Sequence, residues 1–214
     1  PCTIAEVKAY KPENNSTSSG QVLQSPYPYD KALIVIKEMA ELSTLDLVEK
    51  GLVTNQIVLD IAYDVENLKN GEKYAGEIVS DRYGRRAPKP AHGTVNIGKY
   101  SSSTKEITEK TVELFERIVN KNLSVRKLSL TCNHLISETE VREADEQLSL
   151  FDDYEELEKK RVRQLSELEK EKKMQKAMLK IKGKYGKNAV IKGLDLQEGA
   201  TTLERNSQIG GHKA

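Results

Sequence analysis

Apolar and polar residues alternate along three stretches of the chain, and this period of two predicts three β-strands. In the first, the apolar positions are Ile57, Leu59, Ile61 and Tyr63, and the opposite side carries Gln56, Val58, Asp60 and Ala62. The second places Val95 and Ile97 on one side and Thr94, Asn96 and Gly98 on the other. The third places Leu128, Leu130 and Cys132 on one side and Lys127, Ser129 and Thr131 on the other.

Two further segments carry apolar residues at spacings of three and four, which predicts amphipathic helices. In the first we expect Asp30 to cap the N-terminus and Gly51 to end the helix. Its apolar positions are Ala32, Val35, Ile36, Met39, Leu42, Leu45 and Val48. The second helix follows N-cap candidates at residues 101–104. Its buried stripe is expected at Ile107, Thr111, Leu114, Phe115 and Ile118.

The order of these elements predicts the α+β fold class. If residues 18–23 form a first strand, the order is βαββαβ, which gives a four-stranded antiparallel sheet with two helices on one face. Residues 65–90 interrupt this order as an irregular excursion. Its basic tip carries Arg82, Arg85, Arg86 and Lys89. The sheet face without helices carries small and polar residues, so we expect water or a polar ligand to cover it.

The net charge of +1 conceals two oppositely charged blocks. Residues 138–158 hold ten acidic residues and one arginine, whereas residues 159–192 hold thirteen basic and three acidic residues. Such blocks are typical of solvated or partner-binding segments. We therefore expect a long charged helix over residues 153–182, with too little apolar surface to dock firmly, and a flexible tail over residues 183–214.

Composition excludes several classes of protein. Charged residues make up 31% of the chain, and no stretch approaches the roughly 20 apolar residues of a membrane span. Cys2 and Cys132 lack C-x-x-C spacing, so we expect neither a disulfide framework nor a zinc site, and a cytoplasmic location fits best. No signal-peptide pattern is present, and the start at Pro1 indicates a fragment of a longer protein.

No constellation of residues predicts catalysis or metal binding. Cys132 and His134 lie at a strand end without obvious partners, and Asp60 and Asp64 are interpreted as solvated carboxylates. The lysine-rich run over residues 170–187 fits either a solvated helix face or attraction to a nucleic-acid backbone.

The sharpest local signal is the pentapeptide over residues 147–151, which lies in acidic surroundings. It consists of Gln147, Leu148, Ser149, Leu150 and Phe151. Large apolar residues in such a segment predict a linear motif that becomes ordered on binding. A hydrophobic staple at the start of the next helix is the alternative, and spacing alone does not decide between them.

Several stretches resemble one protein family. The pentapeptide resembles the motif by which bacterial polymerases dock on the sliding clamp, where Gln bonds the rim and Leu and the aromatic ring fill an apolar cleft. The βαββαβ unit resembles the little finger domain of Y-family translesion DNA polymerases. Matches to the UmuC-type branch, the ImpB/MucB/SamB family, are Pro1–Ala5, Lys8–Pro12, Ser18–Leu23, Gly51–Thr54 and Glu204–His212. The resemblance covers nearly the whole chain.

This resemblance implies a DNA-binding region rather than a catalytic one. The domains would be a tether from the thumb (1–15), the little finger (16–136), a linker with the clamp motif (137–152), the charged helix (153–182) and the tail (183–214). The little finger would grip primer-template DNA in the major groove without reading bases. The contacts implied are Ser16, Ser18, Ser19, Arg85, Arg86, Thr94, Asn96, Lys99 and Lys127.

The resemblance places the catalytic residues and their two Mg²⁺ ions in another part of the parent protein. That parent would be an error-prone DNA polymerase acting in DNA repair, damage tolerance and the SOS response. This chain alone would hold no cofactor or catalytic residue and would be inactive. A non-catalytic protein-interaction adaptor is the alternative interpretation.

Overall fold

The computed structural model describes residues 3–4, 15–69, 74–80, 84–141, 154–209 and 212–213. Its central unit consists of β1 (Thr17–Tyr27), α2 (Tyr29–Lys50), β2 (Leu52–Tyr63), β5 (Ala91–Ser101), α3 (Thr104–Ile118) and β6 (Val125–Asn133). The order βαββαβ and the α+β class are therefore confirmed. Within the described residues, no helix is both long and apolar enough to serve as a membrane span.

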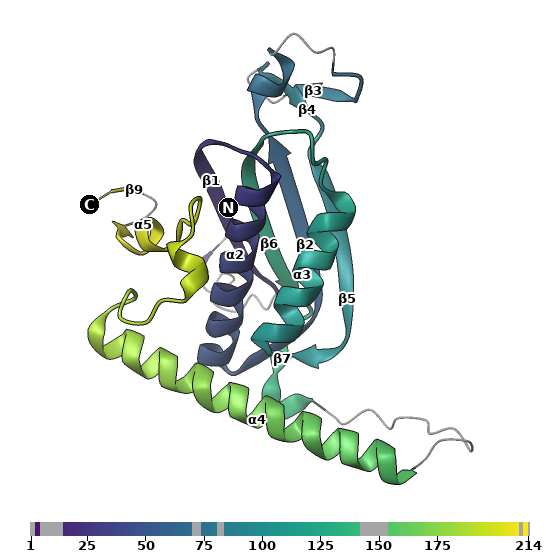
Figure 1. Cartoon of the computed structure of the whole chain (residues 1–214), viewed down its shortest axis with the longest axis vertical. Coiled ribbons are helices and arrows are strands. Elements are labelled where there is room, and N and C mark those ends of the chain that lie inside the picture. Colours follow the sequence, from purple (N-terminus) through teal and green to yellow (C-terminus); the bar gives the residue numbers. More distant parts are fainter. Residues whose placement is uncertain are drawn as a thin grey trace.

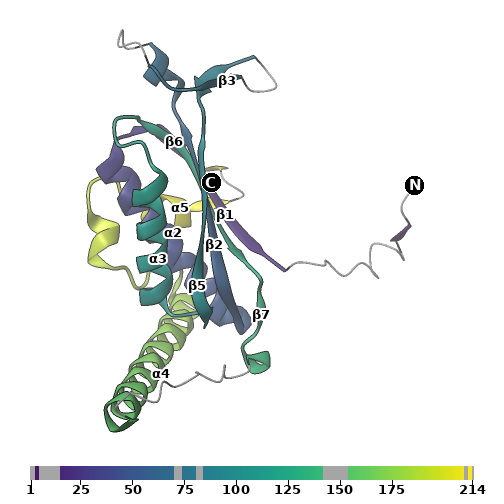
Figure 2. The ribbon, with the colours of Figure 1, turned by 90° about the vertical axis from the view of Figure 1, so that its right-hand side faces the viewer.

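The sheet has the strand order β1-β6-β2-β5, and every pairing in it is antiparallel. A short strand, β7 (Ile136–Ser137), adds a further pairing to the start of β2. Both α2 and α3 cover the same face of the sheet, as Figure 2 shows edge-on. The opposite face carries none of the described helices, and this asymmetry positions the candidate site.

The hydrophobic core lies between the sheet and the two helices. The apolar side chains predicted to point inward from β2 and β6 are buried, with Ile57, Leu59 and Ile61 at 0% exposure. Leu114 and Phe115 of α3 meet them at 0% exposure. Fully burying a side chain of this size stabilises the fold by about 1.5–3 kcal/mol, so this layer holds the sheet rigid behind its open side.

The two helix starts differ in how they are capped. Ser103, one of the four N-cap candidates at residues 101–104, caps α3, because its Oγ accepts a hydrogen bond from the Glu106 N–H at 3.3 Å. The expectation that Asp30 caps α2 is wrong: the N-cap is Pro28, which has no side-chain cap, and Asp30 lies in the first turn. A carboxylate there still interacts favourably with the helix dipole. Gly51 ends α2 as predicted, in the left-handed conformation at φ 65°.

Residues 65–90 form a small excursion beyond one end of the sheet. It contains the 3₁₀ helix η1 (Val65–Leu68) and a two-stranded hairpin of β3 (Ile78–Ser80) and β4 (Arg86–Pro88). Figure 1 shows this hairpin standing above the strands that enter and leave it.

The charged helix α4 (Tyr154–Tyr185) crosses the lower end of the helix layer in Figure 1. The expectation that it would not dock is wrong, because polar contacts replace the missing apolar surface. Gln175 is 3% exposed, and its Nε2 donates to the Ser102 carbonyl at 3.0 Å and to Thr104 Oγ1 at 2.9 Å. Glu171 accepts hydrogen bonds from Ser103 Oγ at 2.7 Å.

The segment expected to be a flexible tail instead carries packed structure. It contains η3 (Gly193–Leu196), α5 (Thr202–Asn206) and the pair β8 (Gln208–Ile209) and β9 (His212–Lys213). Glu38 of α2, 1% exposed, accepts hydrogen bonds from the N–H groups of Thr201 and Thr202 and from Thr201 Oγ1. A buried carboxylate needs such partners, and the tail supplies them.

Candidate functional site

The helix-free side of the sheet is hereafter called the open face. Cross-strand pairing defines it, since directly paired residues point to the same side. Its residues are Ser18, Gly20 and Val22 of β1, Lys127, Ser129, Thr131 and Asn133 of β6, Gln56, Val58, Asp60 and Ala62 of β2, and His92, Thr94 and Asn96 of β5. Small and polar side chains therefore run across all four strands.

Hydrogen bonds between strands hold these side chains in place. A row of amides crosses three strands, in which Asn133 Nδ2 donates to Gln56 Oε1 at 3.1 Å and Gln56 Nε2 donates to Asn96 Oδ1 at 3.0 Å. Beside it, Thr131 Oγ1 donates to Ser18 Oγ at 3.0 Å. The open face thus presents a preformed array of neutral donors and acceptors.

The formal charges of the open face nearly cancel. Its lysine is Lys127, which is exposed, and its carboxylate is Asp60. Asp60 Oδ1 lies 2.6 Å from His92 Nδ1, in a pair whose side chains are 50% and 63% exposed. The carboxylate is therefore partly engaged by the imidazole, and the face as a whole offers hydrogen bonds rather than a strong electrostatic field.

The structure brings four of the residues implied by the family resemblance together on the open face. These are Ser18, Thr94, Asn96 and Lys127. Ser19 lies on the other side, because it pairs with Leu130, whose side chain is in the core. The resemblance implies both Ser18 and Ser19 as contacts, but neighbouring residues of a strand point to opposite sides of the sheet.

Lys99 is also directed away from the open face. Its Nζ forms an ion pair with Glu106 of α3 at 2.7 Å. This direction follows from the alternation of β5, because Lys99 comes two residues after Ile97 and four after Val95, on the helix-covered side of the strand. Close to it, the pairing of β2 with β5 is irregular between the pairs Thr54–Ser101 and Gln56–Asn96, and Gly98 adopts φ 90°, a conformation that favours glycine.

The remaining implied residues lie outside the open face. Ser16 is exposed and precedes β1, and Arg85 and Arg86 belong to the hairpin region above the sheet. The pentapeptide Gln147–Phe151 falls outside the described residues. Three residues that the resemblance did not supply, Gln56, His92 and Asn133, are on the open face. The alternation of β2 already places Gln56 there, and extending the alternation of β6 by one step would have found Asn133.

Other chemistry in the described residues is sparse. No three His, Cys, Asp or Glu side chains among the described residues form a group that could hold a metal ion. Cys132 is buried, and burial raises the pKa of its thiol to about 11. Near neutral pH it is therefore a protonated core residue and not a nucleophile.

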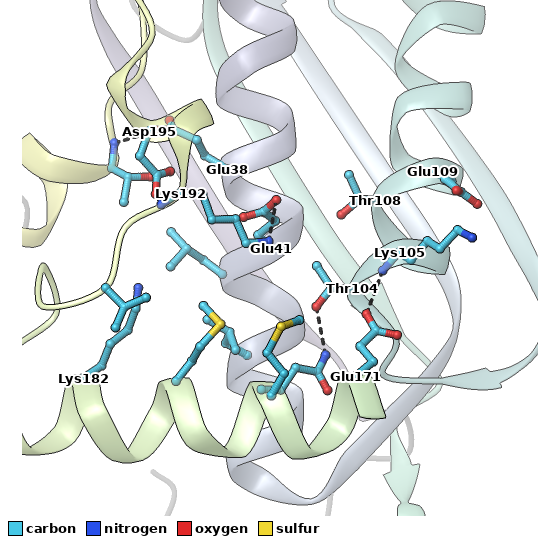
Figure 3. Close-up of a pocket in the computed structure, with 17 residues that line it drawn as sticks. Glu38, Glu41, Thr104, Lys105, Thr108, Glu109, Glu171, Lys182, Lys192 and Asp195 are labelled. Carbon is cyan, nitrogen blue, oxygen red and sulfur yellow. Dashed lines mark hydrogen bonds and ion pairs between the residues drawn. The ribbon is translucent and has the colours of Figure 1, made fainter. Parts of the chain in front are cut away.

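A cavity of about 380 Å³ lies between α2, α3 and α4 on the helix-covered side (Figure 3). Leu42, Leu45, Met174 and Met178 line its apolar part. Its rim carries opposite charges, including an ion pair of 2.9 Å between Lys192 Nζ and Glu41 Oε1. It is a packing space between docked helices, remote from the open face.

Comparison with known proteins identifies a family to which the central unit is similar. A family model described as the impB/mucB/samB family C-terminal domain matches residues 15–150. This range includes the whole βαββαβ unit and all strands of the open face. A search of curated proteins gives no significant match.

Proposed function

Because the chain belongs to the impB/mucB/samB family, whose C-terminal domain it carries, we propose that its open face binds the backbone of primer-template DNA for a Y-family translesion polymerase. The observation that carries the proposal is the array of small polar side chains across a sheet face on which no described helix packs. Such a face is too polar to bury against another core, and phosphate-rich DNA satisfies its donors.

Binding would depend on neutral hydrogen-bond donors. The amides of Gln56, Asn96 and Asn133 and the hydroxyls of Ser18 and Ser129 can donate to phosphate oxygens. Short side chains and Gly20 let a phosphate approach the strands closely. These contacts carry no base information, so the grip is independent of DNA sequence. The same domain can therefore follow a primer terminus along any template.

The test is fluorescence anisotropy with a labelled primer-template duplex. Asn96→Asp keeps the shape of the side chain and its acceptor for Gln56, but it places a carboxylate where a phosphate is expected. We expect about a tenfold loss of affinity, equivalent to about 1.4 kcal/mol. The matched control is Asn122→Asp, the same change in an exposed turn away from the open face.

Equal affinities of both variants would contradict DNA binding by the open face. Association with proteins alone, independent of salt, would instead support the adaptor interpretation.

We further propose that the pentapeptide Gln147–Phe151 docks on the bacterial sliding clamp. Leu148, Leu150 and Phe151 supply three large apolar side chains within an acidic segment, which favours a motif that becomes ordered on a partner. Tethering by a clamp raises the effective concentration of a weakly gripping domain at the primer terminus.

Calorimetry with a bacterial sliding clamp tests this docking. The double variant Leu150→Ala/Phe151→Ala should abolish the heat of binding, because the apolar anchors are lost. The control Val162→Ala/Leu165→Ala removes two apolar side chains that are 57% and 53% exposed on α4, and it should bind normally. If the unaltered chain gives no heat of binding, the pentapeptide is a helix-start staple. The polymerisation step with Mg²⁺ is proposed for the palm of the parent protein.

A further inference from the structure

The rotation of α4 about its own axis is fixed by its polar contacts. Gln175 and Glu171 point into the body of the molecule, where they bond the start of α3. Glu171 also accepts a hydrogen bond from the Lys105 N–H at 3.1 Å. Lys172 pairs with Glu138 after β7. The contacts of these three side chains, all from one side of the helix, determine which side points to solvent.

The solvent side of α4 carries an uninterrupted row of lysines. From residue 172 to residue 187 the chain has seven lysines and no Asp or Glu. Four of them lie three or four residues apart and therefore share one side of the helix. This lysine face consists of Lys173, Lys176, Lys180 and Lys184, all exposed. Lys173 is two positions from the inward-pointing Gln175, about 200° away around the helix.

None of the four lysines forms an ion pair with a carboxylate among the described residues, whereas Lys172 and Lys192 do. A solvated face built only for helix stability would be expected to mix charges, as Arg163 and Glu167 do at 3.2 Å earlier in α4. Unpaired like charges in a row repel one another and destabilise a helix slightly. Their concentration on one side indicates a polyanionic partner.

We propose that the lysine face of α4 is a second DNA contact, separate from the open face, that supplies the electrostatic part of binding. This inference rests on the proposed function. The open face balances Lys127 against Asp60 and so gains little from counterion release, whereas every phosphate neutralised by a lysine strengthens binding at low salt. The lysine face carries that charge on a rigid support.

The dimensions of the face fit duplex DNA. Residues 173 to 184 of a helix span about 16 Å, and a duplex of that length carries about ten phosphates. Four lysines can each reach a phosphate without any base contact, in keeping with the sequence-independent grip of the open face. An extended row of this kind matches a linear polyanion better than a compact acidic patch.

The experiment measures duplex affinity of the full 214-residue chain as a function of salt. The variant K173Q/K176Q/K180Q should make the slope of log K against log salt shallower by roughly 2.7, because each neutralised phosphate contributes about 0.9. The matched control K37Q/K110Q/K121Q removes the same charge from α2, α3 and the turn after α3. It should leave the slope unchanged. Circular dichroism of each variant establishes that its helices are retained.

Two outcomes would overturn the second contact: an unchanged slope in the lysine variant, or an equal decrease in both variants, which would report net charge alone. Asn96→Asp distinguishes a failure of the lysine-face proposal from a failure of the proposed function. If it weakens binding while the lysine variant does not, the open face binds DNA and the lysine face does not. If neither variant changes DNA binding, both proposals fail.

A membrane surface is the competing polyanion, because Met174, Ile181 and Tyr185 are exposed along one side of the lysine face. The same variants are therefore measured with phosphatidylserine vesicles. Vesicle binding that is lost in K173Q/K176Q/K180Q, together with an unchanged DNA slope, would overturn the proposal in favour of lipid.

Discussion

Gly93 is the residue on which the approach of α3 to β5 depends. A Cβ atom at this position would lie 2.8 Å from Ile118 Cγ2 and 2.9 Å from Leu114 Cδ1. Helix and strand pack this closely only because the strand has no side chain there. The sequence shows a glycine in a strand, but not the helix above it.

Gly93→Ala should destabilise the protein by about 1–3 kcal/mol, because Ile118 and Leu114 must shift within a packed layer. Urea unfolding followed by circular dichroism measures this change. Gly20→Ala is the control, since its Cβ would lie no closer than 3.9 Å to Ser129 Oγ. A loss in Gly20→Ala as large as that in Gly93→Ala would contradict the steric explanation.

The protonation of one residue, the buried thiol of Cys132, makes the stability of the fold depend on pH. Its pKa is raised by burial to about 11, so the folded state retains the thiol proton at pH values where the unfolded chain, with a pKa near 8.5, loses it. Stability must then fall as pH rises between these two values. Below pH 8 both states hold the proton and the effect vanishes.

Cys132→Ala should therefore show a smaller loss of stability between pH 8 and pH 10 than the unaltered chain, by on the order of 1 kcal/mol. The measurement is the free energy of unfolding in urea at each pH under reducing conditions. Parallel curves for the two proteins would show that the thiol is not protected in the fold.

At the level of elements, a buried carboxylate of α2 helps to hold the C-terminal segment, beside the ion pairs Lys192–Glu41 and Lys31–Glu198. Glu38 accepts hydrogen bonds from Thr201 N–H at 2.9 Å, Thr201 Oγ1 at 3.0 Å and Thr202 N–H at 3.0 Å. Nearby, Arg205 Nη1 donates to Gln21 Oε1 of β1 at 2.8 Å. The segment thereby covers the helix side of β1 and leaves the open face clear.

Glu38→Gln should release this segment, because an amide cannot accept all these hydrogen bonds and brings donors of its own. A buried charged hydrogen bond of this kind contributes about 1.5–3 kcal/mol. Limited proteolysis should cleave residues 187–209 faster in this variant, whereas Glu49→Gln, an exposed change on the same helix, should not differ from the unaltered chain. Equal cleavage of all three proteins would show that Glu38 does not hold the segment.

At the scale of the whole molecule, two surfaces of different character lie on different sides of one scaffold. The open face is a neutral array of amides and hydroxyls, and the lysine face of α4 is a row of uncompensated positive charge. α4 crosses the end of the helix layer, so the two surfaces do not share strands or side chains (Figure 1). Shape complementarity and salt-dependent attraction can therefore be altered independently.

The amino-acid pattern alone was enough to predict the central unit and most of the open face. Alternation along β2 and β6 assigned Ile57 and Leu130 to the core, because a strand's side chains point to opposite sides at every step. The same rule left Asn96 and Thr131 on the opposite side. Local hydrogen bonding also allowed Gly51 to be identified as the residue that ends α2 and residues 101–104 as the N-cap candidates of α3.

The register at the bulge in β5 and the docking of distant segments could be seen only in the folded molecule. Gly98 lies in a bulge whose extra residues depend on the partner strand, so the pairing of Ser101 with Thr54 could not be obtained from β5 alone. The docking of α4 through Gln175 and of the tail through Glu38 joins residues separated by 71 and 163 positions. Such pairings leave no periodic signal, because hydrogen bonds between distant segments depend on three-dimensional proximity and not on local spacing.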